Sequence, residues 1–597
     1  MAALRPAALA VLAAGALLTW APEVRAQSEG LLQPEDDVHR FLERQRTLGT
    51  LSDAELGAQP LSTYRAYALL DSLARRDSLA RLGEAERGRD PLLLERARPA
   101  RRALSRLDRQ LLARYRGAVV GGVFGPAVAA RTALYGDGRA FARVEGQVTG
   151  GASYALEAEP LAFLEAGPGR QTAVDGADPS PFVYSAARGV RAAGRLGRVF
   201  FDGRVEETQR RVPLGESSGA GIGTAPRLGF VAFPEGRGPT PVYDYILSTG
   251  VVGYTGPSFE ARFGRDRNRW GPGRGSVILS NYAAPYDALQ LRWRVWRVAF
   301  QSLFARSIDL PDSDGLAPQH FVAAHRLALD VGAGVEVEVF EAVAFATDTT
   351  DLGRRGGFEL AYLNPFQLYR GTERDIGSPD NVLLGAGAAW RPVGGVRLYG
   401  QAVLDEFVAS AFAEDDWRNK WGFVLGAQLS DPGVPGLGRL RGLDLGAEYA
   451  RLRPYLYAHR SVQTSYTNLG DGLGHPAGPN ASDLALSARY RPGPDVEVSV
   501  DLARTVRGRD TAELNFGADP TRPYTDRVGD TGIETLQGVR QTEWLVEAQA
   551  GVRLLPDVVG GLAVRARSVD DALDGLRRYA APLVFLRWGR PYLSARF

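Results

Sequence analysis

Arginine and aromatic residues recur together in three segments of the chain that are expected to form polar connections. In order along the chain they are Arg267, Arg269 and Trp270, then Tyr369 and Arg370, then Tyr455, Tyr457 and His459. Aromatic faces pack against sugar rings, and arginine forks hold carboxylates and hydroxyls. These residues are therefore predicted to bind a polysaccharide. The alternative is that they only pack the connections against one another.

His459 and Ser461 suggest a second chemistry, nucleophilic hydrolysis. Residues two apart lie on the same face of an extended segment, and Asn468 could orient the imidazole. The spacing resembles that of barrel phospholipases and lipid A deacylases, although the Gly-Arg context expected after the serine is missing. A hydrolase of lipid or acyl chains therefore remains an alternative.

Other catalytic chemistry has less support. Asp405-Glu406 and Asp415-Asp416 are adjacent in sequence, and adjacent strand residues face opposite ways, which argues against a glycosidase pair. No phosphate-binding glycine motif stands in the expected context. Metal-ligand spacing is missing from the remaining histidines, which are His39, His320, His325 and His475. We predict no catalytic residue, no metal and no cofactor.

Composition narrows the class of protein. Of the 597 residues 45% are hydrophobic and 23% charged, and the mean hydropathy of -0.18 is too polar for a bundle of membrane-spanning helices. The one long apolar run, Pro6 to Leu18, follows Arg5 and precedes Val24-Arg25-Ala26. This is the pattern of a signal peptide, predicted over residues 1–26. With 0 cysteines and a net charge of +2, neither disulfides nor nucleic-acid binding is expected.

Residues 27–117 have a helical pattern and are predicted to form a small periplasmic bundle. Leucines at three- and four-residue spacing run from Leu104 to Tyr115. A second amphipathic helix is expected from Ser62, a plausible N-cap, to Leu82, with Gly83 ending it. Its predicted apolar face is made of Leu69, Leu70, Leu73, Leu79 and Leu82.

Residues 118–597 change to a period of two, as in β-strands. In one run Leu484, Leu486 and Tyr490 alternate with small or polar residues. Strands with one aliphatic face carry polar residues on the other, namely Glu336, Glu338, Arg397, Gln401, Arg565 and Arg567. That alternation is expected when one face meets lipid and the other a wet lumen. Aromatic residues near strand ends, such as Tyr254, Trp390, Tyr399 and Trp544, are candidates for interfacial girdles.

Short and long connections alternate along this region, as in outer-membrane barrels. Tight links are expected at 194–196, 332–334, 393–395 and 492–495, and long ones at 209–241, 348–380, 405–419, 454–482 and 507–540. The alternation gives about twenty candidate strands, of which those near Val119 and Ser276 are the weakest. The chain finishes on an amphipathic run that ends at Phe597 and resembles the recognition signal of such barrels.

Three segments resemble the Wzi-type capsule-assembly proteins of the outer membrane. They are Arg265 to Asn281 with its Trp-Gly-Pro-Gly core, Leu363 to Gly385 followed by Arg397 to Phe407, and Arg453 to Asn480. The resemblance implies a helical periplasmic bundle and a barrel of about 18 strands. It also implies a non-enzymatic role in attaching capsular polysaccharide. We therefore expect an all-β transmembrane antiparallel β-barrel of about 18 strands, within a range of roughly 16 to 20.

The expected partners and location follow from that class. They are capsular or exopolysaccharide, outer-membrane lipid, the barrel-assembly machinery and the polysaccharide export pore, with no nucleic acid. The N-terminal module is expected in the periplasm and the long loops outside the cell. A diffusion porin remains a further alternative, because a charged lumen permits solute flux, although a helical module at one end would tend to plug it.

Overall fold

The structure of the chain is a computed structural model. It describes residues 31–32, 36–51, 57–87, 103–119, 142–147, 153–172, 180–211, 224–225, 229–230, 242–309, 317–346, 359–377, 380–408, 410, 415–436, 438–555 and 557–589. The predicted signal peptide and the predicted final run to Phe597 lie outside these residues.

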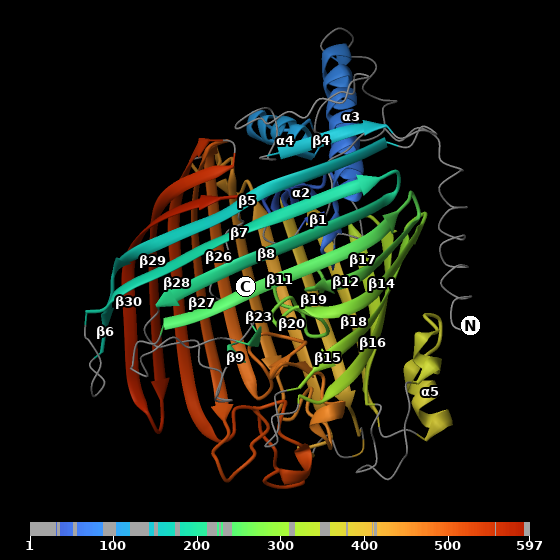
Figure 1. Cartoon of the computed structure of the whole chain (residues 1–597), viewed down its shortest axis with the longest axis vertical. Helices are drawn as coiled ribbons and strands as arrows, with labels where there is room; N and C mark the ends of the chain where they lie inside the picture. The colour runs from blue at the N-terminus through green and yellow to red at the C-terminus, as the bar shows by residue number, and fades with distance from the viewer. Residues whose placement is uncertain are drawn as a thin grey trace, which may run out of the picture.

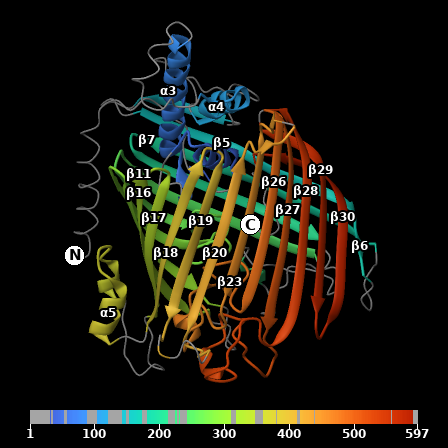
Figure 2. The ribbon, with the colours of Figure 1, turned by 180° about the vertical axis from the view of Figure 1, so that it is seen from behind.

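Eighteen antiparallel strands form a closed barrel (Figures 1 and 2). They are β5 (Ser153–Pro168), β7 (Phe182–Leu196), β8 (Val199–Arg211), β11 (Val242–Thr255), β12 (Phe259–Asp266), β14 (Tyr286–Val295), β15 (Val298–Ile308), β16 (Gln319–Gly332), β17 (Val335–Phe345), β18 (Asn381–Val393), β19 (Val396–Glu406), β20 (Lys420–Ser430), β23 (Leu443–Leu452), β26 (Ala481–Gly493), β27 (Val496–Arg509), β28 (Val539–Leu555), β29 (Val558–Asp571) and β30 (Gly575–Trp588). β30 closes the barrel by pairing with β5, with Leu586 opposite Leu164. The predicted strand number is confirmed.

Shorter strands supplement the barrel. β4 (Ala142–Gln147) pairs with the first half of β5, and β6 (Arg170–Gln171) extends the seam with β30. The others form two-stranded pairs: β1 (Leu31–Leu32) with β3 (Leu61–Ser62), β2 (Ala58–Gln59) with β13 (Arg269–Trp270), β9 (Thr224–Ala225) with β10 (Gly229–Phe230), β21 (Gly433–Val434) with β22 (Gly438–Arg439), and β24 (Thr467–Asn468) with β25 (Asp471–Gly472). The weak candidate at Ser276 lies between β12 and β14 and not in the barrel wall, whereas Val119 ends a helix and the residues directly after it lie outside the described ones.

The predicted alternation of short and long connections is confirmed. Only two residues separate β7 from β8, β16 from β17, β18 from β19 and β26 from β27. Long loops follow β8, β17, β19, β23 and β27. The short turns lie at the end of the barrel that carries the N-terminal helices, which we call the helix end. The described parts of the long loops gather at the opposite end, the loop end (Figure 1).

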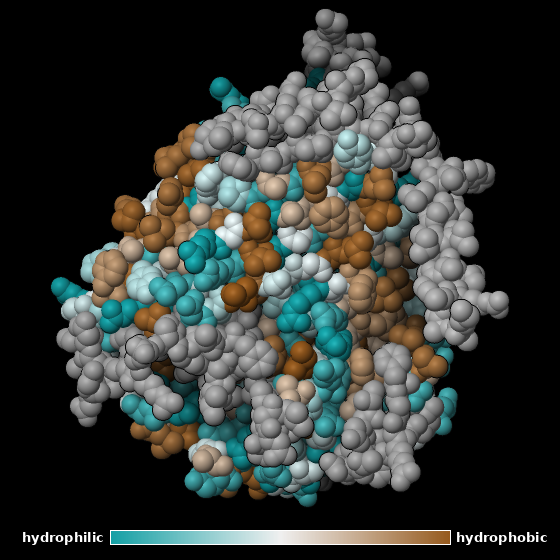
Figure 3. All heavy atoms as spheres, in the orientation of Figure 1, coloured by the Kyte–Doolittle hydropathy of each residue, from teal (hydrophilic) through white to brown (hydrophobic). Residues whose placement is uncertain are grey.

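Side chains alternate between the two faces of the wall as predicted. Leu398 and Val564 are exposed on the outside, whereas their neighbours Arg397 and Arg565 point inward and form ion pairs. Apolar side chains accordingly gather over much of the outer wall (Figure 3). Trp390 and Trp544 also lie on this outer surface. The prediction for Tyr399 is wrong: its ring is buried in the lumen, and its hydroxyl bonds Glu448 there.

Within the described residues, three helices precede the barrel. They are α2 (Asp37–Leu48), α3 (Thr63–Arg87) and α4 (Arg106–Val119), and they share an apolar core of leucines with Phe41 and Tyr115. Gly49 ends α2 in the left-handed conformation, where its N–H bonds Arg46. Two details of the predicted second helix are wrong: α3 continues past Gly83 to Arg87, and Leu79 is exposed. Among the described helices, none is both long and apolar enough to cross a membrane.

A charge placed on the outer wall should destabilise the barrel, whereas the same change in a loop should not. Leu486, in the middle of β26, and Leu514, beyond the end of β27, are both exposed. Leu486→Arg is expected to cost about 2–4 kcal/mol, because arginine near the centre of a bilayer loses hydration. Leu514→Arg should cost about 0–1 kcal/mol. Urea unfolding in phospholipid vesicles measures both values, and equal small effects would show that β26 does not face lipid.

Candidate functional site

The segment between β12 and β14, residues 267–285, folds into the lumen instead of standing outside as an extracellular loop. Its apolar run, Val277, Ile278 and Leu279, is 0% exposed. Arg274 and Gly275 donate their backbone N–H groups to the Glu448 carboxylate on β23, at 2.5 and 3.0 Å. We call this segment the inward loop. Because the loop folds inward, its Trp-Gly-Pro-Gly motif resembles the start of a strand but does not belong to a strand of the barrel wall.

Helix α2 enters the lumen from the helix end and is held there by arginines. Arg44 Nε lies 2.9 Å from Asp108 on α4, and its terminal nitrogens lie 2.7 Å from Asp431 and 2.6 Å from Asp444. Burial lowers the pKa of Arg44, but Asp444 and Asp108 outweigh it and hold that pKa above its usual range. One side chain therefore ties α2 to another helix, to the turn that follows β20 and to the start of β23.

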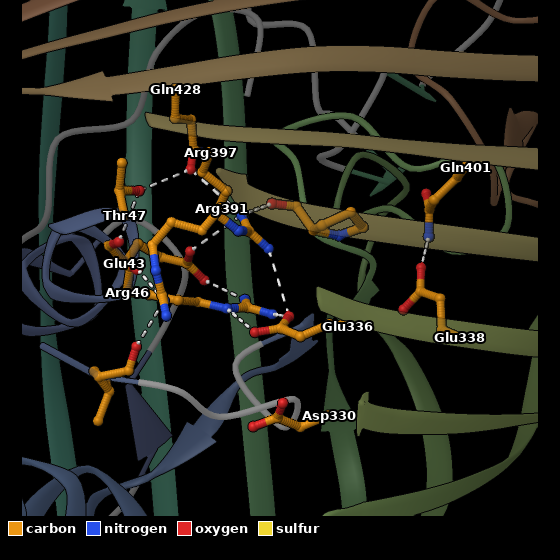
Figure 4. A network of polar contacts seen from close by, with 12 residues as sticks. Glu43, Arg46, Thr47, Asp330, Glu336, Glu338, Arg391, Arg397, Gln401 and Gln428 are labelled. Atoms are coloured by element: carbon orange, nitrogen blue, oxygen red, sulfur yellow. Dashed lines mark hydrogen bonds and ion pairs between the residues drawn. The ribbon is translucent and has the colours of Figure 1, made fainter. Parts of the chain in front are cut away.

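A second group of arginines continues this contact around the wall (Figure 4). Arg46 of α2 pairs with Glu336 of β17, and Arg397 of β19 lies 3.8 Å from the same carboxylate. Thr47 donates to Gln428 of β20 at 3.2 Å. The helix thus contacts inward side chains of β17 and β20, and the charges of this part of the lumen are paired with one another.

A cavity of about 190 Å³ lies between α2 and the inward loop. Both signs of charge line it, including Glu43, Arg269, Arg274 and Glu448, together with His39 of α2. Burial, opposed by Glu43 but reinforced by Arg269, lowers the pKa of His39 to about 4. The imidazole is therefore neutral at physiological pH.

A surface cluster at the loop end combines aromatic rings with arginines. The Arg527 guanidinium lies 4.3 Å above the Trp417 ring, and the Tyr524 ring centre is 4.6 Å from that of Trp417. Arg418 and Arg460 are exposed beside these rings. We call these five residues the loop-end cluster. It is built from three separate loops, which follow β19, β23 and β27.

The residues predicted to bind polysaccharide lie in three different places. Arg267, Arg269 and Trp270 belong to the inward loop, Tyr369 and Arg370 to a segment against the outer wall, and Tyr455, Tyr457 and His459 to the loops that cover the loop end. At most 1% of Trp270, Tyr369, Tyr455 or Tyr457 is exposed. Two of the tyrosine hydroxyls are hydrogen-bonded inside the protein: Tyr455 donates to the Asn515 carbonyl and Tyr457 to the Val277 carbonyl.

That these residues contact polysaccharide stays a prediction. The burial of the rings of Trp270, Tyr369, Tyr455 and Tyr457 does not favour it. Arg370 pairs with Glu373 at 2.7 Å, and Arg267 and Arg269 are half-buried. Of the eight, His459 approaches the loop-end cluster, because its ring contacts Tyr524 at 5.4 Å. Sequence reasoning missed Trp417, Tyr524 and Arg527. A tryptophan between charged residues in a long predicted loop was the available signal for Trp417.

The residues of the hydrolase alternative have separate partners. His459 Nδ1 lies 2.6 Å from Thr464 Oγ1, whereas Ser461 Oγ accepts from the Gln463 N–H. The Asn468 side chain bonds the backbones of Ile308 and Ala284. Burial, together with Lys420 and Arg460, lowers the pKa of His459 well below its usual value. These contacts give no support to a triad of His459, Ser461 and Asn468.

The architecture defines the class: this is the fold of an outer-membrane β-barrel with an N-terminal helical module. Among solved structures the chain is similar to Wzi of Escherichia coli, described as an outer-membrane protein involved in group 1 capsule assembly and a carbohydrate-binding β-barrel. The identity is 12%, the TM-score 0.51, and the alignment covers 95% of this chain and 100% of that one. The predicted Wzi-like fold is confirmed.

Other outer-membrane barrels are more distant. OccAB2 of Acinetobacter baumannii is 10% identical over 72% of this chain and 98% of its own, with a TM-score of 0.39. OprD of Pseudomonas aeruginosa is 10% identical over 72% and 94%, with a TM-score of 0.36. No protein-family model matches the sequence, and no curated protein sequence matches it. The likeness to Wzi supports the fold alone.

Removing the Arg44 side chain should loosen α2 in the lumen. Arg44→Met leaves three carboxylates without this partner, and breaking a buried ion pair from one side costs about 3–5 kcal/mol. Arg75→Met removes a pair with Asp71 from a side chain that is 75% exposed, which should cost at most about 1 kcal/mol. Limited proteolysis of α2 in the folded barrel should therefore be faster for Arg44→Met alone. Equal protection in both variants would contradict this docking.

Acid should weaken the same helix through His39. Because the folded pKa is about 4, against about 6.5 unfolded, the unfolded state binds the proton first as the pH falls. Protonation of His39 is expected to lower the free energy of unfolding by about 3 kcal/mol as the pH falls from about 6.5 to about 4. His39→Gln should flatten the pH dependence of the urea midpoint in this window. A variant that loses stability as steeply as the wild type would count against a neutral buried His39.

Proposed function

We propose that this protein resides in the outer membrane, belongs with the Wzi-type capsule-assembly proteins, and binds exported polysaccharide at its outer surface. The observation that carries the proposal is the loop-end cluster on a Wzi-like barrel. The structure described as Wzi is a carbohydrate-binding β-barrel, and its alignment spans 95% of this chain. The helix end would face the periplasm, and the loop end the outside.

The loop-end cluster has the chemistry for a charged glycan. Trp417 and Tyr524 offer ring surface to sugar C–H groups, and neighbouring arginines offer forks to carboxylates. Arg527 is bonded to the exposed Asp530, so an acidic sugar would exchange that surface carboxylate for its own, while Arg418 stays bonded to the buried Asp416. Because a surface ion pair contributes little free energy to stability, that exchange costs little free energy. We therefore favour an acidic polysaccharide.

Retention of polysaccharide needs no reaction, so a non-catalytic role fits the proposal. In this role the protein would contact the polysaccharide export pore at the outer membrane and, during its own assembly, the barrel-assembly machinery. A diffusion porin is the competing function, and the occupied lumen argues against it. Helix α2 and the inward loop both lie inside the barrel, and the ion pairs of Arg44 hold the helix.

Deletion of the gene tests the proposed function in the cell. Capsule imaging of the deletion strain should show polysaccharide shed from the surface, whereas an unchanged capsule would contradict the proposal. Liposome swelling with the purified protein separates the porin alternative, since solute flux favours a porin. Retention of polysaccharide without flux favours a surface lectin.

Substitutions in the loop-end cluster should weaken retention specifically. Trp417→Ala with Arg527→Ala removes one ring and the guanidinium stacked on it, and we expect binding of the purified native polysaccharide to weaken roughly tenfold, or about 1.4 kcal/mol. The matched control is Trp544→Ala with Arg504→Ala. That pair stacks in the same way at 5.6 Å, but it belongs to the strands β28 and β27.

Titration calorimetry of both double variants in detergent provides the comparison. Unchanged binding by the Trp417 variant, in a barrel that folds normally, would remove the loop-end cluster from the proposal. Equal loss in both variants would point to a general effect on stability instead.

A further inference from the structure

Residues 359–377 lie outside the barrel, against its wall. They contain η4 (Leu360–Leu363), a tip, and α5 (Tyr369–Ile376). The rings of Tyr362 and Tyr369 meet edge to face at 5.6 Å, so the two arms of the segment lie side by side. Opposite views of the molecule both place α5 beyond the strands (Figures 1 and 2). We call this segment the outer-wall hairpin.

The hairpin runs along the length of the wall. At its base, Tyr362 donates its hydroxyl to Asp380, the residue before β18, at the loop end. At its tip, the Phe366 ring stacks on Phe300 at 5.4 Å and contacts Trp293 at 6.1 Å. Phe300 and Trp293 are each the third residue from the turn that joins β14 to β15 at the helix end. The hairpin therefore crosses the band of wall that lipid would surround.

Its first arm and tip are apolar on the outward side, whereas Arg374 and Asp375 of α5 are exposed. Leu360, Phe366 and Leu368 are 71%, 75% and 70% exposed. Beside them the outward residues of β17, Val337 and Val339, are also exposed. The apolar side of the hairpin is thus continuous with the lipid-facing wall, and the exposed amide oxygen of Asn364 at the tip accepts the Phe366 N–H. The charged residues of α5 follow Tyr369 and return toward the loop end.

The hairpin covers a polar row on the outward face of the wall. Ser302, His325 and Glu341 stand opposite one another on β15, β16 and β17. Glu341 accepts the Tyr369 and Arg370 N–H groups at 2.8 and 2.7 Å, and it pairs with His325 at 3.2 Å. A carboxylate facing lipid without such donors would be costly. The row has the residue types of a hydrolase triad, but both oxygens of Glu341 are engaged by the hairpin, which favours an anchoring role.

We propose that the outer-wall hairpin is embedded in the membrane, where Leu360, Phe366 and Leu368 contact lipid acyl chains, and that Glu341 anchors it to the barrel. Backbone outside a barrel survives in hydrocarbon only when its polar groups are satisfied by protein. Glu341 and the helical bonds of α5 supply that satisfaction. The inference gives a role to the segment from Leu363 to Gly385, one of those that resemble the Wzi-type proteins, for which polysaccharide binding offers no role. The inference does not rest on polysaccharide binding.

Spin labels on single cysteines test the contact, because the chain has 0 cysteines of its own. Leu368→Cys, Val339→Cys and Leu514→Cys place labels on the hairpin, on the wall and on a loop, all at exposed positions. In proteoliposomes, collisions with oxygen report lipid and collisions with a soluble nickel complex report water. The label at 368 is expected to match that at 339, with an oxygen-to-nickel ratio severalfold above that at 514.

Two results would overturn the contact with lipid. A ratio at 368 equal to that at 514 would place the hairpin in water, and low collision rates with both reagents would mean that a protein partner covers it. Glu341→Ala tests the anchor in the same assay: the label at 368 should gain mobility while the barrel keeps its heat-modifiable migration. Unchanged mobility would overturn the anchoring role. If this variant does not fold, the three labels in the otherwise wild-type chain still decide the contact.

Discussion

The structure depends on one constraint, that backbone N–H and C=O groups in hydrocarbon must be bonded within the protein. A sheet meets it only by closing on itself, and here β30 meets β5 with Leu586 opposite Leu164. Closure fixes the period of two, because every second side chain then faces lipid and the others face the lumen. The composition follows: aliphatic residues predominate outside, and charged strand residues such as Arg397 and Arg565 point into the lumen, whereas Glu341 faces outward beneath the hairpin.

Charges gathered in a lumen must find partners there, and arginine is suited to this because one fork reaches several carboxylates. Arg44 contacts Asp108, Asp431 and Asp444, which belong to α4 and to the neighbourhood of one barrel turn. The helical module is therefore joined to the barrel through the same side chains that neutralise its interior. The inward loop does this from the other side, where the Glu448 carboxylate receives two of its backbone N–H groups.

The sequence was informative wherever a local pattern decides the structure. Alternation predicted the strands and their faces, and the lengths of polar stretches predicted the connections. Tyr399 was misassigned because an aromatic residue near a strand end fits a girdle as well as it fits a hydrogen bond to Glu448 in the lumen. Gly83 was misassigned because α3 is held by packing against α2 and α4, which outweighs the preference of one glycine.

Long loops were harder, because their direction depends on distant contacts. Val277 to Leu279 is an apolar run between Ser276 and Ser280, and its sequence does not show whether it folds into a lumen or stands outside. The outer-wall hairpin is a similar case, since only the register of β16 with β17 brings His325 beside Glu341. The loop-end cluster joins Trp417 to Tyr524, more than a hundred residues apart, and no pattern along the chain connects them.

A disulfide across the seam tests the closed barrel most directly. Leu164→Cys with Leu586→Cys places thiols on facing, exposed positions of β5 and β30, and Tyr449→Cys with Leu484→Cys does the same on β23 and β26. Facing strand residues lie within disulfide reach. On oxidation in lipid vesicles, both pairs are expected to cross-link within one chain and to migrate faster on a denaturing gel. Cross-linking of the second pair without the first would contradict closure, and with it the sealed lumen on which the account rests.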